Sequence, residues 1–199
     1  MRTVSTETQI YLSSNSPRRA ELLTQIGVTF ERVKAEVEEV LQPDEAAEQY
    51  VTRLARQKAQ AGFLNSAKDK PVLGADTIVV IDEQILEKPR DKTHAEQMMN
   101  LLSGRTHQVF TAVALVNERF TKACLVKTDV TFKPLTLQQI SDYWQTGEPI
   151  DKAAGYGIQG IGGRFVTHIN GSYTAVVGLP LYETDMLIKE FLEESRYVG

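Results

Sequence analysis

The sequence predicts an α/β fold, because segments typical of strands alternate with segments typical of helices. Residues 10–12 suit a strand, and a helix is expected to begin at Pro17. Residues 71–82 form a nearly continuous apolar run, which is typical of a central strand buried on both faces. A chain of 199 residues is long enough for one domain with a full core, or for two small lobes around a cleft.

The other elements are predicted from periodicity and turn residues. Further strands are expected at residues 30–36, 85–86, 109–116, 123–132 and 165–169. Further helices are expected from Pro43 to Gly62 and at residues 93–102, 136–143 and 181–191. Residues 1–199 are expected to form a single domain, with polar tails at about residues 1–8 and 193–199.

Composition excludes several classes of protein. The hydrophobic content of 42% and charged content of 24% argue against a disordered or collagen-like chain. The net charge is −4, so we expect no basic surface for nucleic acid and only a local anion site. The single cysteine, Cys124, excludes an internal disulfide and fits a reducing compartment. No segment has the apolar length of a signal peptide or membrane span, so a cytoplasmic protein is expected.

The predicted helix that begins at Pro17 has an unusual first turn. Ser16 is a good N-cap, and proline is favoured at the first helical position. Arg18 and Arg19 then occupy the turn in which acidic residues are usual. Cations beside free backbone N–H groups predict an anion site, and phosphate is the anion that we expect there. The alternative is a solvated basic turn.

Charged residues at two further places have both a structural and a functional interpretation. Glu36, Glu38 and Glu39 form either a solvated acidic turn or ligands for a hard cation such as Mg²⁺. Lys58 lies at the centre of the apolar stripe of its predicted helix. An inward lysine should reach a carboxylate, a phosphate or a cleft, or else extend to water at the helix end.

Asp76 interrupts the apolar run of residues 71–82. A buried aspartate in a strand is costly unless it pairs with a cation or faces a cleft, so a functional role is favoured. Gly74, two residues earlier, would let another group approach the strand closely.

Two loops complete the set of candidate residues. Residues 87–91 read EKPRD, and Lys88 matters if this loop lies near Asp76. Residues 155–163 contain five glycines but fit neither a P-loop nor a dinucleotide-binding motif. Such a turn would let Gln159 approach a flat ligand and hydrogen-bond the edge of a base. The three histidines show no metal-ligand spacing.

Four predicted features together favour metal-assisted hydrolysis of a phosphate ester or anhydride. They are an anion-binding helix start, a buried aspartate, an acidic cluster and an inward lysine. Several strings also closely resemble the Maf family of nucleoside triphosphate pyrophosphatases, over nearly the whole chain from about residue 10 to 191. They are SSNSPRRAELL (13–23), LGADTIV (73–79), EKPRD (87–91), YGIQGIGG (156–163) and INGSYTAVVGLPL (169–181).

Within the family, the chain looks most like the subgroup acting on dTTP and UTP. The resemblance implies a two-lobed mixed-sheet α/β fold with a central cleft, similar to inosine-triphosphate pyrophosphatases. It also implies hydrolysis to the monophosphate and diphosphate, a divalent cation such as Mg²⁺ or Mn²⁺, and a homodimer. The implied role is to keep modified nucleotides out of nucleic acid, with a link to division arrest. Two alternatives stay open: another base preference, such as methylated GTP, and a nucleotide-binding regulator of septum formation without turnover.

The resemblance also assigns roles to individual residues. Asp76 matches the family's proton acceptor, and together with Glu39 it is the expected metal partner. The residues expected to hold phosphates are Ser14, Arg18, Lys58 and Lys88. The residues expected to select the base are Arg19, Thr77 and Gln159. Asn15 departs from the glycine of close relatives and should stiffen the loop.

Overall fold

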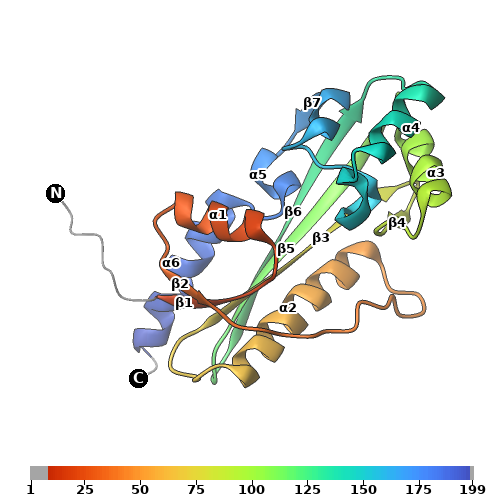
Figure 1. Cartoon of the computed structure of the whole chain (residues 1–199). Helices are drawn as coiled ribbons and strands as arrows, with labels where there is room; N and C mark the ends of the chain where they lie inside the picture. Colours follow the sequence, from red (N-terminus) through yellow and green to blue (C-terminus); the bar gives the residue numbers. More distant parts are fainter. Residues whose placement is uncertain (1–8, 198–199) are drawn as a thin grey trace. The chain divides into compact units, whose positions relative to one another are not determined.

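The computed structural model describes residues 9–197, which contain a seven-stranded mixed sheet (Figure 1). The strand order is β2-β1-β3-β5-β6-β7, with β4 paired to β3. β1 is parallel to β2 and β3, whereas β4 and β7 are antiparallel to β3 and β6. The predicted α/β class is confirmed. The strands are β1 (Ile10–Ser13), β2 (Phe30–Arg32), β3 (Val72–Ile81), β4 (Gln84–Leu86), β5 (Thr106–Val116), β6 (Thr121–Phe132) and β7 (Val166–Asn170).

Helices make up most of the remaining regular structure. The α-helices are α1 (Pro17–Gln25), α2 (Ala47–Asn65), α3 (Lys92–Leu102), α4 (Leu137–Gln145), α5 (Tyr173–Val177) and α6 (Leu181–Tyr197). Three short 3₁₀ helices precede β7, namely η1 (Glu148–Asp151), η2 (Ala153–Gly155) and η3 (Ile161–Phe165). Among residues 9–197, no helix combines the length and apolar character that a membrane span requires.

The chain divides into two compact units. Unit 1 comprises residues 1–76, 111–126 and 178–199, and unit 2 comprises residues 77–110 and 127–177. The strands β3, β5 and β6 therefore contribute residues to both units. The expected cleft between two lobes stays a prediction.

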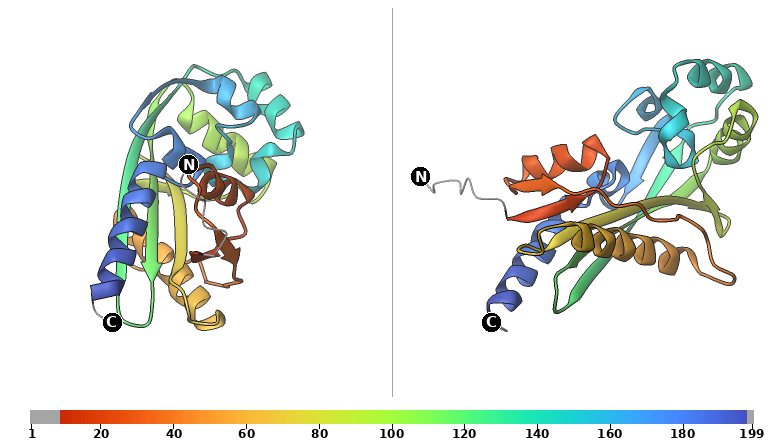
Figure 2. Two further views of the ribbon diagram at one scale, coloured as in Figure 1. Left: turned by 90° about the vertical axis from the view of Figure 1, so that its left-hand side faces the viewer. Right: turned by 60° about the horizontal axis from the view of Figure 1, so that its bottom comes forward.

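Unit 1 is built on the parallel strands β1, β2 and the first half of β3, with α2 packed closely against them. A Cβ atom at Gly74 would lie 2.4 Å from the backbone nitrogen of Ala59 and 2.6 Å from the backbone oxygen of Ala55. The predicted close approach at Gly74 is therefore confirmed, and its partner is the backbone of α2. At the turn between β5 and β6, the ring of Phe120 lies 4.5 Å from that of Phe191 on α6, which runs beside this hairpin (Figure 2).

Unit 2 has its own apolar core, in which α3 packs against α4 and η2. Most of its buried residues come from the second half of β3, from α3, β6, α4 and η3, and from the turn after η2; they include Val79, Ile81, Met99, Leu102, Val130, Phe132, Ile140, Tyr143, Tyr156 and Phe165. His107 is buried at its edge, with Nε2 2.8 Å from the hydroxyl of Tyr156. Burial lowers the pKa of His107 to about 4, so this ring is neutral at physiological pH.

Several predicted boundaries differ from the structure. The strand expected at residues 30–36 ends at Arg32. The long helix begins at Ala47 rather than at Pro43, because Asp44 adopts a positive φ of 56° that no helix allows. α6 continues to Tyr197, past the polar tail expected from about residue 193, while residues 1–8 and 198–199 lie outside the described part. The helix α5 and the three 3₁₀ helices were not predicted.

Candidate functional site

The start of α1 has the predicted geometry of an anion-binding turn. The hydroxyl of Ser16 accepts a hydrogen bond from the backbone N–H of Arg19 at 3.4 Å, and Pro17 follows as the first helical residue. The hydroxyl of Ser14 accepts hydrogen bonds from the backbone N–H of Ser16 at 3.2 Å and from Nη1 of Arg19 at 3.4 Å. Arg18 and Arg19 are both half-buried, and no acidic residue occupies this turn. Positive charge therefore gathers at the helix end that already attracts anions.

Arg19 is held in place by unit 1 itself. Its Nε donates a hydrogen bond to the carbonyl oxygen of Gly178 at 2.9 Å. Burial lowers the pKa of Arg19, while the nearby carboxylates of Asp76 and Glu39 raise it. A guanidinium stays charged under all physiological conditions, so Arg19 acts on those carboxylates as a fixed cation.

Lys58 points inward from α2 and lies between two carboxylates. Its Nζ is 2.5 Å from Oδ1 of Asp76 and 2.6 Å from Oε1 of Glu39, which lies on the loop before α2. The backbone carbonyl of Lys58 also accepts a hydrogen bond from the hydroxyl of Ser13 at 2.7 Å, at the end of β1. The predicted inward direction of Lys58 is confirmed, and its partners are two of the carboxylates that the sequence had singled out.

Asp76 is buried in the middle of β3, with only 6% of its surface exposed. Burial raises its pKa, and the positive charges of Lys58 and Arg19 oppose this rise without cancelling it. The carboxylate is therefore a stronger base than an exposed aspartate while remaining paired with cations. This combination is typical of a carboxylate that accepts a proton in a reaction.

The two carboxylates fit a divalent cation in chemistry and in number. Asp76 and Glu39 already share one cation, the ammonium of Lys58. Carboxylate oxygens are the ligands that Mg²⁺ and Mn²⁺ prefer, and Mg²⁺ commonly takes one or two carboxylates, with water and phosphate oxygens completing its shell. Within residues 9–197, no group of three or more His, Cys, Asp or Glu residues gathers as a complete protein-only metal site.

The other predicted site residues belong to unit 2. Thr77 follows Asp76 in β3 and is half-buried, Lys88 is exposed in the loop before α3, and Gln159 is exposed in the turn before η3. The loop that carries Lys88 is fixed within its unit, because the carbonyl oxygen of Glu87 accepts a hydrogen bond from the backbone N–H of Ala154 at 2.9 Å. The approach of Thr77, Lys88 and Gln159 to the carboxylates of unit 1 stays a prediction.

Sequence reasoning missed the side chains that support the turn of Gln159. Glu148 and Tyr143 make hydrogen bonds with the backbone of that turn, whereas the sequence had shown Tyr143 only as part of an apolar helix face. Five glycines in residues 155–163 were the available signal, because so many glycines indicate that bulky groups approach the backbone closely.

The family profile described as "Maf-like protein" matches residues 9–191. The chain belongs to the Maf-like family. This family match spans the described elements from β1 to most of α6, including every candidate site residue.

Curated relatives are similar over almost the whole chain. The dTTP/UTP pyrophosphatase of Escherichia coli O157:H7 is 61% identical over 191 residues, which covers 95% of this chain and 97% of the relative. The dTTP/UTP pyrophosphatase of Escherichia coli K12 and the nucleoside triphosphate pyrophosphatase of Shigella flexneri are each 60% identical over the same shares of the two chains. These relatives are hydrolases, and this Maf-like chain is an enzyme of the same class.

A solved structure shows a more remote likeness. The dITP/XTP pyrophosphatase of Mycobacterium abscessus is 15% identical and has a TM-score of 0.47, over 96% of this chain and 97% of that one. A likeness at this level supports no inference about the site.

Proposed function

We propose that this Maf-like protein hydrolyses dTTP and UTP, together with modified pyrimidine nucleotides, to the nucleoside monophosphate and diphosphate. The observation that carries the proposal is the buried Asp76, paired with Lys58 and close to the charge of Arg19. A buried carboxylate beside positive charge supports the proposal, because hydrolysis of a triphosphate requires a group that accepts a proton and cations that offset phosphate charge. The names of relatives at 60–61% identity supply the substrate class.

In the proposed reaction, Asp76 accepts a proton from a water molecule whose oxygen forms a bond to the α-phosphorus. The bond between the α-phosphorus and the oxygen bridging to the β-phosphorus breaks, and diphosphate leaves with the electron pair. Positive side chains offset the charge that gathers on the triphosphate oxygens during this step, and a neutral hydroxyl can donate a hydrogen bond to them. The proposed cations are Arg18, Lys58 and Lys88, and the proposed hydroxyl is that of Ser14.

A divalent cation would be held by Asp76 and Glu39, the carboxylates that now share Lys58. When bound, it would lower the pKa of water and neutralise charge on the phosphates. The ammonium of Lys58 would then be available to phosphate oxygens, since it need not balance both carboxylates.

Base selection is proposed for Arg19, Thr77 and Gln159. A uracil or thymine ring presents two carbonyl oxygens on either side of one N–H group. An amide such as that of Gln159 offers both a donor and an acceptor to this pattern. A site with hydrogen-bonding groups matched to one base rejects another base, because mismatched polar groups remain unpaired.

The cellular setting is proposed from composition and from the family resemblance. The negative net charge of −4 and the single cysteine support a small-molecule enzyme of the cytoplasm that acts on free nucleotides rather than on nucleic acid. We further propose that the protein works as a homodimer.

Replacement of Asp76 with Asn tests the proposal. With Mg²⁺ or Mn²⁺ present, we expect the wild type to convert dTTP and UTP to monophosphate and diphosphate, and Asp76→Asn to lose about 10³-fold in kcat. The matched control is Asp82→Asn, because Asp82 lies on the turn after β3 and is exposed, with Arg105 as its partner. The control should retain the wild-type kcat.

Three results would contradict the proposal. Normal turnover by Asp76→Asn would remove the assigned role. Preference for a methylated guanosine triphosphate would place the chain in another subgroup of the family. Failure of the wild type to hydrolyse any triphosphate would favour a nucleotide-binding regulator.

A further inference from the structure

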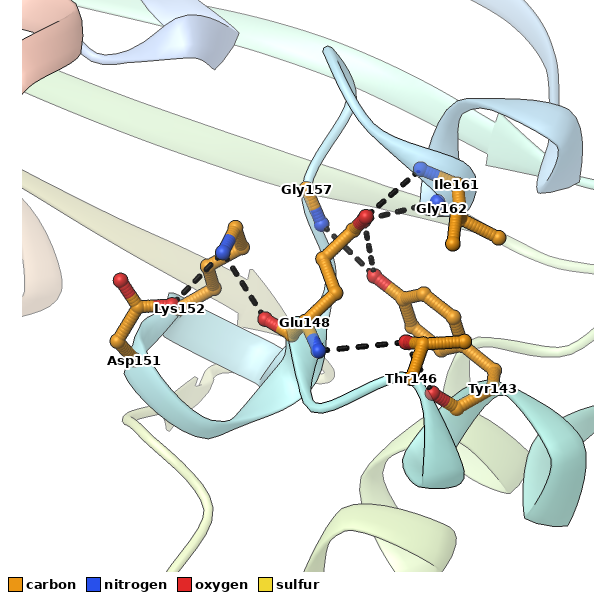
Figure 3. Close-up of polar contacts among 8 residues, drawn as sticks. All are labelled: Tyr143, Thr146, Glu148, Asp151, Lys152, Gly157, Ile161 and Gly162. Atoms are coloured by element: carbon orange, nitrogen blue, oxygen red, sulfur yellow. Dashed lines mark hydrogen bonds and ion pairs between the residues drawn. The ribbon is translucent and has the colours of Figure 1, made fainter.

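A single carboxylate holds the far end of the turn that carries Gln159 (Figure 3). The backbone N–H of Ile161 donates a hydrogen bond to Oε2 of Glu148 at 2.7 Å. The backbone N–H of Gly162 donates to Oε1 of the same carboxylate at 2.9 Å. The two carboxylate oxygens therefore fix two successive backbone groups on the C-terminal side of Gln159.

The near end of the turn is linked to the same carboxylate through a phenol. The hydroxyl of Tyr143 donates a hydrogen bond to Oε1 of Glu148 at 2.7 Å and accepts one from the backbone N–H of Gly157 at 3.1 Å. Gly157 and Gly162 flank Gln159 on its two sides. One connected network thus anchors the turn before and after the side chain that is proposed to contact the base (Figure 3).

Two glycines of this turn are required by the network. A Cβ atom at Gly160 would lie 2.2 Å from Oε2 of Glu148, and one at Gly162 would lie 2.6 Å from the hydroxyl of Tyr143. Any side chain at these positions would push the carboxylate or the phenol away from the backbone. Glycine at these two positions therefore leaves room for the side chains of Glu148 and Tyr143, in addition to allowing Gln159 to approach a ligand.

Charge strengthens the network. Burial alone would raise the pKa of Glu148, but hydrogen bonds from Gly162, Tyr143 and Ile161 hold it below its ordinary value. Glu148 is therefore ionised at neutral pH, and its hydrogen bonds are of the stronger, charge-assisted kind. The ammonium of Lys152 donates to the backbone carbonyl of Glu148 at 2.9 Å, which fixes the main chain from which the carboxylate extends.

We propose that Glu148 is a positioning residue for base selection, which acts by holding the turn of residues 157–162 so that Gln159 presents its amide in one orientation. This inference rests on the proposed function of Gln159. It goes beyond that proposal because it assigns specificity to a residue that does not itself contact the base.

Replacement of Glu148 with Gln tests the inference, because the amide keeps the shape and removes the charge. The ratio of kcat/KM for UTP to that for CTP should fall about tenfold, mainly through a higher KM for UTP. Turnover of CTP should stay unchanged, because loss of orientation removes only the advantage of the correct base. The matched control is Asp151→Asn, which removes a carboxylate from the same 3₁₀ helix; the carboxylate of Asp151 contacts Lys152, at 2.7 Å. This control should keep the wild-type ratio.

An amide NMR measurement checks the contacts independently of turnover. Amide protons that bond to a carboxylate resonate downfield, so the signals of Ile161 and Gly162 should move upfield in Glu148→Gln and stay in place in Asp151→Asn. If thermal denaturation shows that Glu148→Gln is not folded, Tyr143→Phe serves as the second variant. It removes one hydroxyl from the network while keeping the buried ring, and it should lower the same ratio.

The outcomes separate the two proposals. A wild type that hydrolyses UTP and CTP equally contradicts the proposed base selection before any variant is made. A selective wild type whose variants keep its ratio overturns the role of Glu148 and leaves the proposed function standing. Equal loss of UTP and CTP turnover in the variants also overturns it, because that result indicates a general structural role.

Discussion

Replacement of Lys58 with Met removes the cation between two carboxylates and leaves most of its apolar side chain. The two ion pairs differ in exposure. The side chain of Glu39 is 43% exposed, so water can replace its lost partner, whereas that of Asp76 is 8% exposed and cannot be hydrated in the same way. Most of the cost should therefore come from Asp76. Breaking a buried pair costs about 3–5 kcal/mol, and the remaining charge of Arg19 places the expected loss near the lower end, at about 3 kcal/mol.

The loss in Lys58→Met should depend on pH in a defined direction. Burial already raises the folded pKa of Asp76 above its unfolded value, and Lys58 opposes that rise. A carboxyl group whose pKa is raised by folding costs no stability at a pH below its unfolded pKa. As pH increases from the unfolded pKa through the folded pKa, the free energy of unfolding decreases. Without Lys58 the folded pKa rises further, so the penalty grows. The variant should therefore be most destabilised near neutral pH and close to the wild type at about pH 4.

Urea unfolding of both proteins at about pH 7.5 and pH 4.5 measures this effect. The matched control is Lys92→Met, because Nζ of Lys92 lies 3.5 Å from Oε1 of Glu96 on the surface of α3, with 49% of the lysine side chain exposed. Loss of that exposed pair should cost about 0.5 kcal/mol or less. Two results would contradict this prediction: a stability loss in Lys58→Met that is no larger than that of the control, or a loss that is the same at both pH values.

Two further predictions concern stability. A methyl group at Gly74 would collide with the backbone of Ala59, so Gly74→Ala should destabilise the protein by about 3 kcal/mol in urea unfolding. A loss below about 1 kcal/mol would contradict the close packing of α2 against β3. His107 has a folded pKa of about 4 and an unfolded pKa of about 6.5. The free energy of unfolding should therefore decrease by about 3 kcal/mol as pH falls through that interval, because the unfolded state binds the proton more readily. Replacement with Gln, which cannot titrate, should flatten the pH dependence of stability between those values, and parallel curves for wild type and variant would rule this out.

Local rules predicted the parts of the site that depend on one element. Ser16 and Pro17 defined the start of α1 because capping chemistry is contained within four residues. The helical period placed Lys58 on the buried face of α2, and the long apolar run made Asp76 conspicuous as a buried charge. The contact between these two side chains follows from the packing of α2 on β3, which the sequence indicated only through Gly74.

Contacts between distant residues explain where prediction failed. Proline followed by acidic residues is a common helix start, yet Asp44 forms a turn with positive φ and α2 begins at Ala47. The turn is stabilised by Glu45, which accepts hydrogen bonds from Nε and Nη2 of Arg53 at 2.6 and 2.7 Å. This pair joins residues eight positions apart, which is outside the spacing that helix-start rules use.

The contacts on which the proposed role of Glu148 rests could not be predicted from the sequence either. Its partners are a phenol and two backbone N–H groups, and a backbone group leaves no mark in the sequence. Only the glycines at positions 160 and 162 indicated that another group approaches there. For Thr77, Lys88 and Gln159, the assigned roles rest on the family resemblance and stay predictions.

Hydrolysis of UTP in ¹⁸O-labelled water shows whether water attacks the α-phosphorus, because the position of the label identifies the phosphorus atom that water attacks. We expect the label to enter the nucleoside monophosphate and the diphosphate to stay unlabelled, with this incorporation lost in Asp76→Asn. Label in the diphosphate, or release of labelled orthophosphate, would contradict attack at the α-phosphorus and the role assigned to the Asp76 site.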